Sequence, residues 1–515
     1  METLSEMLRY WAMLRPDGLA VSFEDRDLTW AELDRSSSSI AAGLVSTGVG
    51  AGDVVAILTD NCPEFIEVMF AALKLGAAVS PLNIRWTPSE LVFPLQDAAA
   101  RVLIAGQSFS DQVAAVSEKL PDLAVYLVGS PDHGSFDVLR AESQSPPLHT
   151  GDGSDVAFIC YTSGTTGFPK GSLITHKGVL AAGIAKALAA GLTWRDKLLI
   201  VNPLVYTSGV LTKFLETAFV VGAPTVITRG FDPAEFLRLV EEEGITMTSA
   251  VPVILETVMR HPKFETTDLS TLSIVWAGGA AVPETLLHTW RARGVPLMQA
   301  YGLTELSGAS GVLLSPEDAE ARPNSTGRPI LFHTLKIVGP DGVECERGEV
   351  GEITIQGPAV MKGYLNRPDQ TAEAIRDGWL FTGDMGTMDA DGYLYLVDRR
   401  KDLLISGGIN VYPAEIERVL DGRAGAEELV VIGVPDERWG QVPVMIVSNA
   451  QCVDVPELIA ICEAELADYK RPRYLIDWAG PLPRTLSGKV DKNELRDRFS
   501  NPPADAISLR VKSGS

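Results

Sequence analysis

The sequence predicts an α/β protein with more than one domain, and three observations support this fold class. The chain has 515 residues, more than a single hydrophobic core usually supports. In its first part, segments with helical spacing of apolar residues alternate with short apolar runs, a rhythm typical of helices packed on sheets. After about residue 325, short strand-like runs separated by Gly, Pro and Asp indicate a β-rich subdomain.

The expected elements of the large N-terminal part follow this alternation. Helices are predicted at 33–47, 62–75, 181–192 and 233–244, and strands at 53–58, 76–82, 197–201, 225–228 and 273–276. The β-rich subdomain should contain strands at 334–338, 351–356 and 392–397. We therefore expect two α/β layers and a β-rich subdomain in this part.

A smaller α+β unit is expected beyond a boundary near Arg400. Its predicted helices lie at 413–420 and 455–466, and its predicted strands at 429–432 and 442–447. The sequence thus predicts domains over 1–400 and 401–500. Residues 501–515 contain Pro, Ser and Gly and are expected to form a disordered tail.

Composition and charge exclude several classes of function. Hydrophobic residues make up 46% of the chain and charged residues 22%, which is ordinary for a globular enzyme. Lys and Arg total 44 against 67 Asp and Glu, so the net charge is −23. Such an acidic surface repels nucleic acid and anionic membranes, so neither is an expected partner. An anionic substrate would need a local basic site.

The cysteines and histidines indicate no metal site and no disulfide framework. The five cysteines contain no CxxC pair, and the six histidines are equally dispersed, which favours a reducing compartment. Met1 to Leu14 carries charges throughout and is not a secretory signal. The sequence contains no run of about 18 uncharged apolar residues, so no transmembrane helix is expected. The expected location is the cytoplasm. The cysteines are Cys62, Cys160, Cys345, Cys452 and Cys462.

One glycine-rich loop suggests phosphate binding. The run Tyr161-Thr162-Ser163-Gly164-Thr165-Thr166-Gly167-Phe168-Pro169-Lys170-Gly171 lies between two strand-like segments. Glycines let backbone N–H groups approach an anion, the hydroxyls add donors, and Lys170 supplies a positive charge. The loop differs from a P-loop, because Lys170 is followed by Gly171 and a β-like run rather than by Ser or Thr and a helix. An ordinary Ser/Thr/Gly surface loop is the alternative reading.

Four further segments combine residue types that suit nucleotide chemistry. They are Tyr301-Gly302-Leu303-Thr304-Glu305, Trp379-Leu380-Phe381-Thr382-Gly383-Asp384, Ser406-Gly407-Gly408-Ile409-Asn410-Val411-Tyr412-Pro413, and Pro483-Arg484-Thr485-Leu486-Ser487-Gly488-Lys489. Together with the glycine-rich loop, and in this order, they resemble the adenylate-forming superfamily of acyl-CoA synthetases, peptide-synthetase adenylation domains and luciferases. The resemblance runs from about Leu28 to Arg496, and the chain looks closest in type to acyl-CoA ligases. Any one segment would be weak, but five in order are specific.

The resemblance implies a reaction and a division of labour between domains. The family converts a carboxylic acid and Mg-ATP to an acyl-adenylate and pyrophosphate, and then passes the acyl group to a thiol. Residues 1–400 would form the AMP-binding domain, and residues 401–500 a small mobile domain that carries the catalytic Lys489. Asp402 matches the hinge about which this domain would rotate between the two half-reactions.

The resemblance also implies an ATP site. Thr304, Glu305 and Lys489 would serve the catalytic step, with Glu305 binding Mg²⁺ and Lys489 bridging the carboxylate and the α-phosphate. Tyr301 would stack on adenine, and Asp384, assisted by Arg399, would accept from the ribose hydroxyls. The full set implied for ATP or AMP is Thr162, Ser163, Gly164, Thr165, Thr166, Gly167, Lys170, Gly278, Gly279, Ala280, Ala300, Tyr301, Gly302, Leu303, Thr304, Asp384 and Arg399.

Separate sets of residues are expected to bind coenzyme A and the acid. Gly407, Gly408 and Trp439 match the pantetheine tunnel of CoA ligases, and Arg85 and Lys470 could meet the nucleotide part of CoA. The acyl pocket should be lined by Tyr206, Ser208, Gly209, Val251, Trp276, Ala277, Gly278, Ala300, Gly302 and Gly308. These residues are mostly small or apolar, and their glycines are expected to leave volume, which suggests a bulky hydrophobic acid: aryl, alicyclic or polycyclic.

Two positions complicate the acyl pocket. Many relatives carry an aromatic–histidine pair after Asn202-Pro203-Leu204, whereas this chain has Val205-Tyr206, and a tyrosine does not titrate near neutrality. Lys213 lies in an otherwise apolar helical run, and Glu216 at i+3 could neutralise it. We expect this pairing. Unpaired and facing the pocket, Lys213 would instead bind a second polar group of the substrate.

Ordinary structural roles compete with each functional one. Tyr301 and Trp439 could be core aromatics, and Asp384 could close a turn. The charged run from Asp398 to Asp402 could be a solvated surface segment. Lys489 could be an exposed loop lysine.

The function expected from these features is an acyl-CoA synthetase that uses ATP, Mg²⁺ and CoA. The alternatives are a stand-alone adenylation enzyme that loads an acyl carrier protein, and a catalytically silent AMP-binding regulator. The presence of Lys489 and Asp402 argues against the silent regulator. Luciferase-like oxidation has no specific support in the sequence. The sequence also leaves the oligomeric state, monomer or homodimer, open.

Overall fold

A computed structural model gives the fold of the chain. It describes residues 1–130, 135–140, 149–162, 169–279, 282, 284–308, 311–339, 341–399, 404–411, 413–420, 423, 429–448, 453–478, 480, 482–483, 490, 492–499 and 506–509. The chain divides into two compact units. The first unit comprises Met1–Ile84, Leu95–Tyr161 and Gly171–Val397, and the second comprises Arg85–Pro94, Thr162–Lys170 and Asp398–Ser515.

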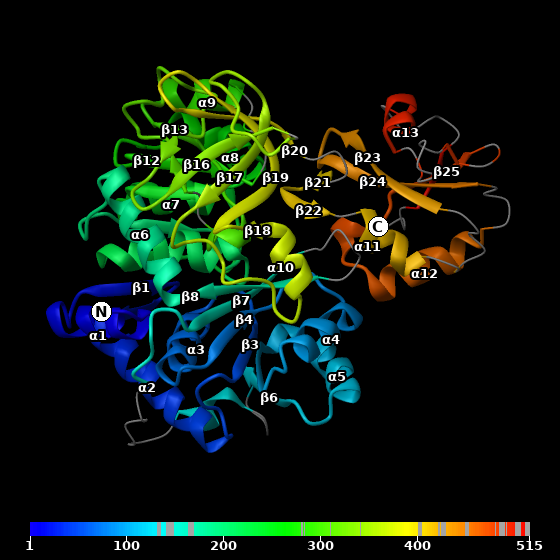
Figure 1. Ribbon diagram of the computed structural model, residues 1–515. Helices are drawn as coiled ribbons and strands as arrows, with labels where there is room; N and C mark the ends of the chain where they lie inside the picture. Colours follow the sequence, from blue (N-terminus) through cyan, green and yellow to red (C-terminus); the bar gives the residue numbers. More distant parts are fainter. Residues whose placement is uncertain are drawn as a thin grey trace. The chain divides into compact units, whose positions relative to one another are not determined.

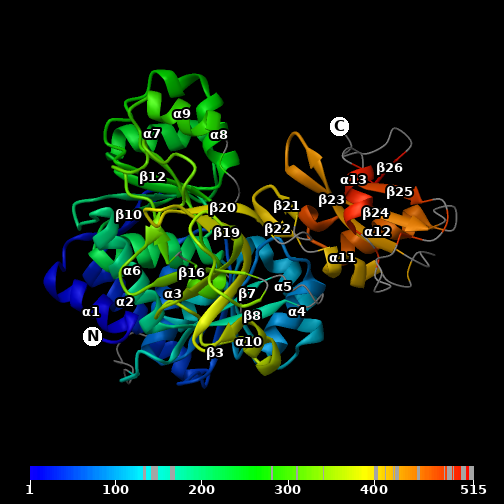
Figure 2. The same cartoon turned by 45° about the horizontal axis from the view of Figure 1, so that its top comes forward.

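The first unit contains a seven-stranded sheet in the order β13-β12-β11-β9-β10-β1-β2. Neighbouring strands are parallel except for the terminal β1–β2 hairpin. Helices α7, α8 and α9 gather on one side of β12 (Figure 2) and bury a cluster around Phe236 and Trp290. The strands are β1 (Leu19–Phe23), β2 (Arg26–Thr29), β9 (Leu198–Ile200), β10 (Thr225–Ile227), β11 (Met247–Ala250), β12 (Ile274–Gly278) and β13 (Leu297–Ala300).

A six-stranded sheet in the order β6-β5-β3-β4-β7-β8 forms the second α/β layer of this unit (Figure 1). Its central strand β3 is buried at all five positions, as expected of a strand covered by helices on both faces. The strands are β3 (Val54–Leu58), β4 (Ala78–Pro81), β5 (Val102–Gly106), β6 (Ala124–Val128), β7 (Val156–Thr162) and β8 (Lys170–Thr175).

Local signals in the sequence explain where the helices of the first unit begin. Helix α2 starts after a capping box of Thr29 and Glu32, and α3 has Pro63 in its first turn. The helices are α1 (Leu4–Leu14), α2 (Trp30–Ser46), α3 (Pro63–Lys74), α5 (Ser110–Lys119), α6 (His176–Ala190), α7 (Pro233–Glu243), α8 (Pro252–Arg260), α9 (Glu284–Ala292) and α10 (Pro368–Ala374), while most of α4 (Pro88–Asp97) belongs to the second unit.

A third, antiparallel sheet forms the β-rich part of the first unit. Its order is β16-β17-β19-β18, and β20 also pairs with β19. The pairing of β17 with β19 shifts register between Glu352 and Thr354, which marks a bulge in β19. The strands are β16 (Thr334–Val338), β17 (Gly351–Gln356), β18 (Ile375–Arg376), β19 (Trp379–Met388) and β20 (Leu394–Arg399), and a separate short pair joins β14 (Val312–Leu313) to β15 (Arg328–Pro329).

The second unit is built on a sheet of order β22-β21-β24-β25-β26, with β23 also paired to β24. Its core contains Val430, Ile432, Val444 and Ile446 from the long β23–β24 pair. The elements are β21 (Leu404–Ser406), β22 (Ile409–Val411), α11 (Pro413–Leu420), β23 (Leu429–Asp436), β24 (Gly440–Ser448), α12 (Val455–Glu465), β25 (Tyr474–Trp478), α13 (Lys492–Arg498) and β26 (Ile507–Ser508).

The predicted α/β fold class is confirmed, and most predicted elements occur within a few residues of their expected bounds. One helix begins five residues earlier than predicted, at His176, because the side chain of Thr175 accepts a hydrogen bond from Gly178 N and caps it. The predicted domain bounds at 400 and 500 remain predictions. The predicted tail, 501–515, lies outside the described residues except for 506–509.

A second difference concerns the helical run around Lys213. This run is a π-helix, η3, that spans Ser208–Ala218. Its hydrogen bonds join residues five apart, so residues three apart are turned further from each other than in an α-helix. This geometry matters for the pairing of Lys213 described below.

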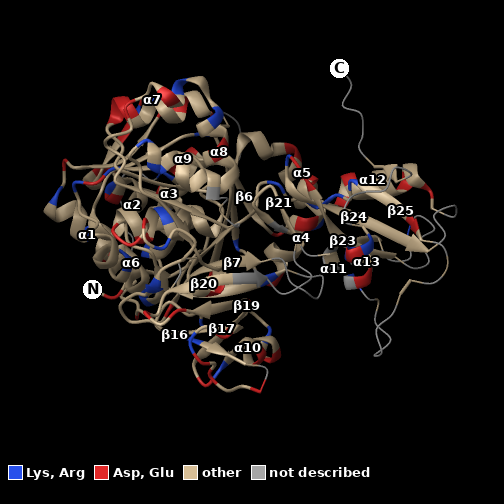
Figure 3. Cartoon of the chain, turned by 90° about the horizontal axis from the view of Figure 1, so that it is seen from above, with Lys and Arg blue, Asp and Glu red and all other residues tan. Residues whose placement is uncertain are grey.

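Several bulk properties follow from the described part of the chain. None of its helices is long and apolar enough to cross a membrane. Cys62, Cys160, Cys345 and Cys462 are free thiols. Acidic and basic side chains are spread over many elements, with a red concentration of glutamates on α7 (Figure 3).

Candidate active site

Four parallel strands of the seven-stranded sheet place most of the predicted site at one edge. Strands β13, β12, β11 and β9 are successive neighbours, so their carboxyl ends meet at the same edge of the sheet. The segments that leave these ends are Tyr301–Glu305, Gly278-Gly279, Val251 and Asn202–Tyr206. This edge is where open α/β sheets bind ligands. Residues up to about 100 positions apart in the sequence are thus brought together.

Tyr301 is joined to Asp384 by a hydrogen bond. The Tyr301 hydroxyl donates to Asp384 Oδ2 at 2.9 Å, and the ring is 6% exposed. Asp384 lies at the bulge in β19, after Gly383, whose φ of +74° suits a glycine. The bulge turns Asp384 toward the tyrosine from a different sheet. Tyr301 and Asp384, the residues predicted to contact adenine and ribose, are therefore direct hydrogen-bond partners in the folded protein.

Thr304 and Glu305 lie at the start of a short 3₁₀ turn and contact residues that the sequence did not single out. Thr304 Oγ1 lies 3.2 Å from Thr207 Oγ1, and the Tyr364 hydroxyl donates to Glu305 Oε1 at 2.8 Å. Glu305 is half-buried. Thr207 is adjacent to the predicted Tyr206 and Ser208, but no spacing or motif marks Tyr364.

A cysteine at the end of β7 lies close to this group. The Cys160 thiol is buried next to Thr207, and burial raises its pKa to about 12. A thiol that is neutral at physiological pH is a poor nucleophile. Cys160 is therefore a packing residue rather than an acyl acceptor.

The glycines of the predicted acyl pocket do not simply leave volume. A Cβ on Gly209 would lie 2.2 Å from Pro203 O, and one on Gly278 would lie 3.0 Å from Ala300 O. A Cβ on Gly308 would approach Thr207 Cγ2 and Thr212 Oγ1 to 2.8 Å each. The expectation that these glycines open the pocket is corrected: they allow close approach of neighbouring chain segments.

The predicted gate residue Tyr206 is half-buried and its segment is held by a buried asparagine. The Tyr206 hydroxyl donates to Asn83 Oδ1 at 3.3 Å. Asn61, 2% exposed, donates to Asn202 O and Thr228 O at 2.9 Å each and accepts from Leu204 N at 2.7 Å. Asn61 thus fixes the turn that precedes Tyr206, a role that its sequence context did not reveal.

The expected ion pair between Lys213 and Glu216 does not form. Lys213 is 4% exposed and Glu216 is fully buried, but the described residues provide no ion pair or hydrogen bond to either side chain. The π-helix explains this, because it turns residues three apart away from each other. Burial lowers the pKa of Lys213 to about 7, with Lys186 contributing, and raises that of Glu216 well above its ordinary value.

Lys186 on α6 is the cation that does have partners. Its ammonium donates to Thr212 O at 3.0 Å and Thr217 Oγ1 at 2.6 Å, and it lies 4.6 Å from the centre of the Trp276 ring. Burial lowers its pKa to about 8, and Glu216 opposes that shift. Lys186 was absent from the predicted site, although it lies in an apolar helical run like the one that drew attention to Lys213.

The other predicted residues of this edge fall into three groups by exposure. Trp276 and Ala277 are buried within the sheet, whereas Ser208 and Gly279 are exposed. The half-buried members are Val251, Gly278, Ala300, Gly302, Leu303, Thr304 and Gly308.

Part of the predicted nucleotide site lies outside the described residues. Thr162 ends β7 and Lys170 begins β8, so the two flank the glycine-rich loop as the strand–loop–strand prediction required. Arg399 ends β20, and its side chain is not described. The predicted residues outside the described part are Ser163, Gly164, Thr165, Thr166, Gly167, Ala280, Asp402 and Lys489.

In the second unit, Gly407, Gly408 and Trp439 lie together. Gly407 and Gly408, with φ of +59° and +77°, form the two-residue turn between β21 and β22. Gly407 N donates to Trp439 O at 2.9 Å, and a Cβ on Gly407 would meet the Trp439 ring at 2.8 Å. The three residues predicted for pantetheine thus share one face of this sheet.

A basic cavity lies beside Trp439 in the same unit. It has a volume of about 350 Å³, and its lining includes Arg438, Arg471 and Arg473 against the carboxylates Glu463 and Asp468. Arg471 donates to Leu466 O at 2.9 Å and to Glu463 O at 3.2 Å. Arg438 stacks over the Trp439 ring at 4.9 Å, whereas Arg473 pairs with Asp468 at 3.0 Å. The cavity offers guanidinium groups that suit phosphate.

Lys470 and Arg85 lie near each other in the second unit, but they are already engaged. Lys470 is 2% exposed and forms an ion pair of 2.9 Å with Glu90. The Arg85 guanidinium lies 5.9 Å from the centre of the Tyr469 ring. A buried ion pair is costly to break, so Lys470 is poorly suited to bind CoA in this arrangement.

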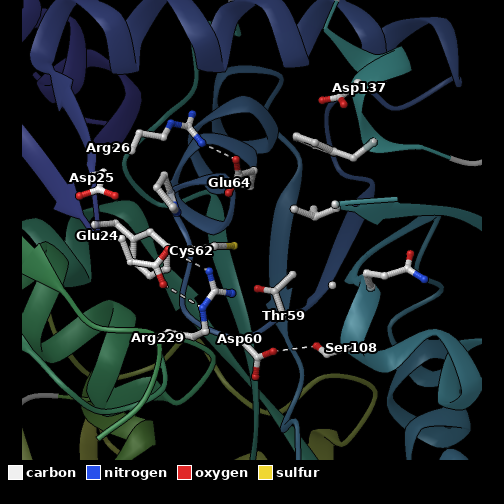
Figure 4. A pocket seen from close by; sticks show the side chains of 17 residues that line it. Glu24, Asp25, Arg26, Thr59, Asp60, Cys62, Glu64, Ser108, Asp137 and Arg229 are labelled. Atoms are coloured by element: carbon white, nitrogen blue, oxygen red, sulfur yellow. Dashed lines mark hydrogen bonds and ion pairs between the residues drawn. The ribbon is translucent and has the colours of Figure 1, made fainter. Parts of the chain in front are cut away.

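A separate cavity of about 640 Å³ lies between the two α/β sheets of the first unit (Figure 4). Its wall contains five carboxylates against two arginines, and Arg229 is already paired with Glu24. This balance repels an anionic acid or nucleotide, so the cavity is not part of the candidate site. The carboxylates are Glu24, Asp25, Asp60, Glu64 and Asp137, and the arginines are Arg26 and Arg229.

Comparisons with known protein families agree with this geometry. The family model described as "AMP-binding enzyme" matches residues 8–365, and the model for the C-terminal domain of the same enzymes matches residues 415–489. The first match covers both α/β sheets and part of the β-rich subdomain.

Individual relatives cover nearly the whole chain. A feruloyl-CoA synthase from an Amycolatopsis species is 39% identical over 95% of this chain and 97% of its own. A long-chain-fatty-acid–CoA ligase from Mycobacterium tuberculosis is 35% identical over 97% and 99%, respectively. The solved structure of o-succinylbenzoate CoA synthetase from Bacillus subtilis, bound to a product analogue, superposes with a TM-score of 0.86 at 34% identity, covering 96% of this chain and 98% of its own.

Proposed function

The chain belongs to the family of AMP-binding enzymes, and we propose here how its residues serve the chemistry of that family. It is an AMP-forming acid–CoA ligase. The carboxylate of the acid attacks the α-phosphorus of ATP, and pyrophosphate leaves to give an acyl-adenylate. The thiol of CoA then attacks the acyl carbon, AMP leaves with the bonding electrons, and a thioester forms. The match of both family models in order carries this conclusion.

The nucleotide is proposed to bind at the strand edge around Tyr301 and Asp384. Their hydrogen bond holds the tyrosine ring in place for stacking on adenine, and the Asp384 carboxylate would accept from the ribose hydroxyls. The loop between Thr162 and Lys170 would bind the β- and γ-phosphates through backbone N–H groups and the lysine. Thr304 would donate to the α-phosphate, and Arg399 would assist at the ribose.

Glu305 fits a magnesium ion. Mg²⁺ is usually held by one or two carboxylates together with substrate phosphates and water, and Glu305 supplies one half-buried carboxylate beside Thr304. Tyr364 fixes the orientation of this carboxylate by donating to one of its oxygens. When bound, Mg²⁺ neutralises phosphate charge.

Lys489 is proposed to lower the barrier of the first half-reaction. An anion attacks another anion in this step, and negative charge builds up on the phosphate oxygens. A positioned donor to such developing charge typically contributes about 3–4 kcal/mol. We infer that rotation about Asp402 then withdraws Lys489 and presents another face of the small domain.

Coenzyme A is proposed to bind around Gly407, Gly408 and Trp439. Gly407 lies in close contact with Trp439, and an extended pantetheine chain would pass along these residues. The neighbouring cavity with Arg438 and Arg471 would bind the phosphates. Arg85 and Lys470 are weaker candidates, because Lys470 is neutralised by Glu90.

The acid is proposed to be bulky and at least partly aromatic or alicyclic. Tyr206 supplies aromatic surface at the edge of the sheet, Val251 adds an aliphatic wall, and Trp276 contributes a buried ring within β12. The relatives named above, a feruloyl-CoA synthase and an o-succinylbenzoate CoA synthetase, support an acid of this type.

An acyl carrier protein remains the alternative acceptor. Its phosphopantetheine arm would use the same face as CoA, but the basic cavity beside Trp439 favours the free nucleotide. A catalytically silent AMP-binding regulator is a further alternative, and it predicts that no acid causes pyrophosphate release.

A screen of pyrophosphate release across carboxylic acids, with and without CoA, tests the function. Aromatic and alicyclic acids should give pyrophosphate, and CoA should convert the adenylate to a thioester with stoichiometric AMP. Thioester formed only on a phosphopantetheinylated carrier protein would overturn CoA as the acceptor. Absence of pyrophosphate with every acid would overturn the enzymatic function.

A further inference from the structure

A cluster of buried polar side chains adjoins the predicted acyl pocket in the first unit. It comprises Lys186, Thr212, Lys213, Glu216 and Trp276, and we call it the buried polar cluster. Lys186, Lys213, Glu216 and Trp276 are each less than 7% exposed. Helices α6 and η3 and strand β12 contribute these residues, so the cluster lies where two helices pack beside the sheet.

Only one cation of the buried polar cluster is satisfied. Lys186 donates to Thr212 O and Thr217 Oγ1 and rests over the ring of Trp276. Lys213 makes no hydrogen bond or ion pair with any described residue. An ammonium group removed from water without a partner is strongly unfavourable.

Three further polar groups of the cluster also lack partners. They are both carboxylate oxygens of Glu216, the hydroxyl of Thr212 and the indole nitrogen of Trp276. Buried polar groups in folded proteins are nearly always paired, so several unpaired groups in one place point to a missing ligand. The location is relevant, because Thr212 Oγ1 would be only 2.8 Å from a Cβ on Gly308, which belongs to the predicted pocket.

We propose that Lys213 binds a second oxygen group of the substrate acid, an anionic oxygen such as a second carboxylate, distinct from the carboxylate that reacts. This inference rests on the proposed function as an acid–CoA ligase. The ammonium has three donors and no acceptor, so it selects an oxygen acceptor over an apolar group or a cation. The Thr212 hydroxyl and the Trp276 indole N–H are further donors without a partner in the buried polar cluster.

The charges around Lys213 favour an anionic partner over a neutral one. Lys186 is a second cation in the cluster, and Glu216 is the one carboxyl group. Burial raises the pKa of Glu216 well above its ordinary value, which favours its neutral form. Two lysines therefore face an incoming anion while burial weakens the opposing charge of Glu216, and the "bulky hydrophobic" description of the acid needs this polar addition.

A matched series of acids tests the proposal. We would compare cinnamic acid with its 4-carboxy, 4-hydroxy and 4-methyl derivatives, using the complete enzyme with ATP and CoA and measuring kcat/KM from AMP release. Wild-type enzyme should prefer the 4-carboxy acid over the 4-methyl acid by about 10- to 100-fold. The 4-hydroxy acid separates an anionic from a neutral oxygen acceptor, and an equal preference for it would overturn the anionic assignment.

The variant Lys213→Met removes the charge and keeps a similar length. It should reduce kcat/KM for the 4-carboxy acid by about 10- to 100-fold and leave the 4-methyl acid within about threefold. Equal losses for both acids would overturn the proposal, because they would mean a structural role or contact with the reacting carboxylate. Lys177→Met, at an exposed position of α6, controls for loss of one surface charge and should change neither acid.

The pH profile gives a second readout. Because the pKa of Lys213 is lowered to about 7, the preference for the 4-carboxy acid should fall as the pH rises through this value in free enzyme. Lys186 and Glu216 belong to the same cluster and remain in Lys213→Met. If the preference for the 4-carboxy acid keeps its pH dependence in this variant, Lys213 is not the group that binds the second oxygen group. If no acid of any kind yields AMP in wild-type enzyme, the proposed function itself has failed rather than this inference.

Discussion

At the scale of single residues, the candidate site is organised by hydrogen bonds between segments far apart in the chain. Tyr301 donates to Asp384 and Tyr364 donates to Glu305. In each case a tyrosine hydroxyl orients a carboxylate that has a proposed ligand. This arrangement lowers the conformational entropy that the carboxylate loses when the ligand binds.

The pair of Tyr301 and Asp384 gives the first prediction. Tyr301→Phe keeps the ring but removes the hydroxyl, so it should raise KM for ATP about fivefold to tenfold and change kcat less. ATP–pyrophosphate exchange measures both constants. Tyr395→Phe is a matched control, because Tyr395 makes a similar contact of 3.3 Å with Asp389 in the β-rich subdomain. An equal rise in both variants would contradict a specific role of Tyr301.

Asn61 gives a second prediction at the same scale. Asn61→Ala removes three hydrogen bonds of a buried side chain and leaves backbone groups of Asn202, Leu204 and Thr228 without them. We expect a loss of about 2–3 kcal/mol in the free energy of unfolding, measured by urea denaturation. Asn366→Ala removes an exposed contact with Asp97 O and should cost less than about 0.5 kcal/mol. Comparable losses in both variants would contradict a special role for the turn before Tyr206.

At the scale of secondary-structure elements, two irregularities shape the site. The bulge in β19 presents Asp384, and the π-helix η3 separates Lys213 from Glu216. Both features replace regular geometry at a place where a ligand is proposed, as is common for bulges and π-helices. A regular α-helix would have allowed the ion pair that the sequence suggested.

The π-helix therefore predicts a stability effect. Without substrate, Lys213→Met should stabilise the protein at pH 6 by at least about 1 kcal/mol, because it removes a buried unpaired cation. The pKa of Lys213 is lowered from 10.5 to about 7 in the folded protein, so the unfolded state binds more protons between these values. The stability contribution of Lys213 therefore rises with pH from about 7 to about 10.5.

Urea unfolding of wild type and Lys213→Met at pH 6 and pH 9 measures this effect. The advantage of the variant should be largest at pH 6 and shrink at pH 9. Lys186 and Glu216 are present in both proteins and affect the comparison only through their coupling to Lys213. A gain in stability of Lys213→Met that does not depend on pH, or a loss of stability at pH 6, would contradict the inference that Lys213 is a buried cation without a partner.

At the scale of the whole molecule, the two half-reactions are assigned to different residues. The first unit carries Tyr301, Asp384 and the proposed acid site, whereas the second unit carries Gly407, Gly408 and Trp439 together with the segment Thr162–Lys170. The proposed alternation through Asp402 would let one substrate site serve two reactions.

Lys489→Ala tests this division. It should abolish ATP–pyrophosphate exchange, with a loss of about 100-fold or more, while thioester formation from supplied acyl-adenylate and CoA stays within about threefold. Single-turnover assays of each half-reaction provide the measurement. Trp439→Ala is the converse variant: it should raise KM for CoA and spare the exchange reaction. Equal loss of both half-reactions in Lys489→Ala would contradict the assigned role.

Much of the fold was predictable because it follows from local patterns. The strands at 334–338 and 351–356 and the helix at 413–420 match β16, β17 and α11, since alternation, periodicity and flanking Gly or Pro are properties of the chain itself. The partners of Asn61, Tyr364 and Lys186 were not predictable. Their contacts join residues 26 to 167 positions apart, and local spacing in the sequence does not encode such partners.

By itself, the sequence determined the α/β class, the order of the elements and the residue types of the nucleotide site, because motifs and periodicity are encoded locally. Only the tertiary structure decided which strands are neighbours: β1 pairs with β10, about 200 residues later, and β9, β11, β12 and β13 align to gather the site at one edge. It also decided that Lys213 and Glu216 do not pair, because the geometry of η3 depends on its packing against α6 and β9. The choice between a paired and a substrate-binding lysine is made by burial and neighbours, which spacing in the sequence does not encode.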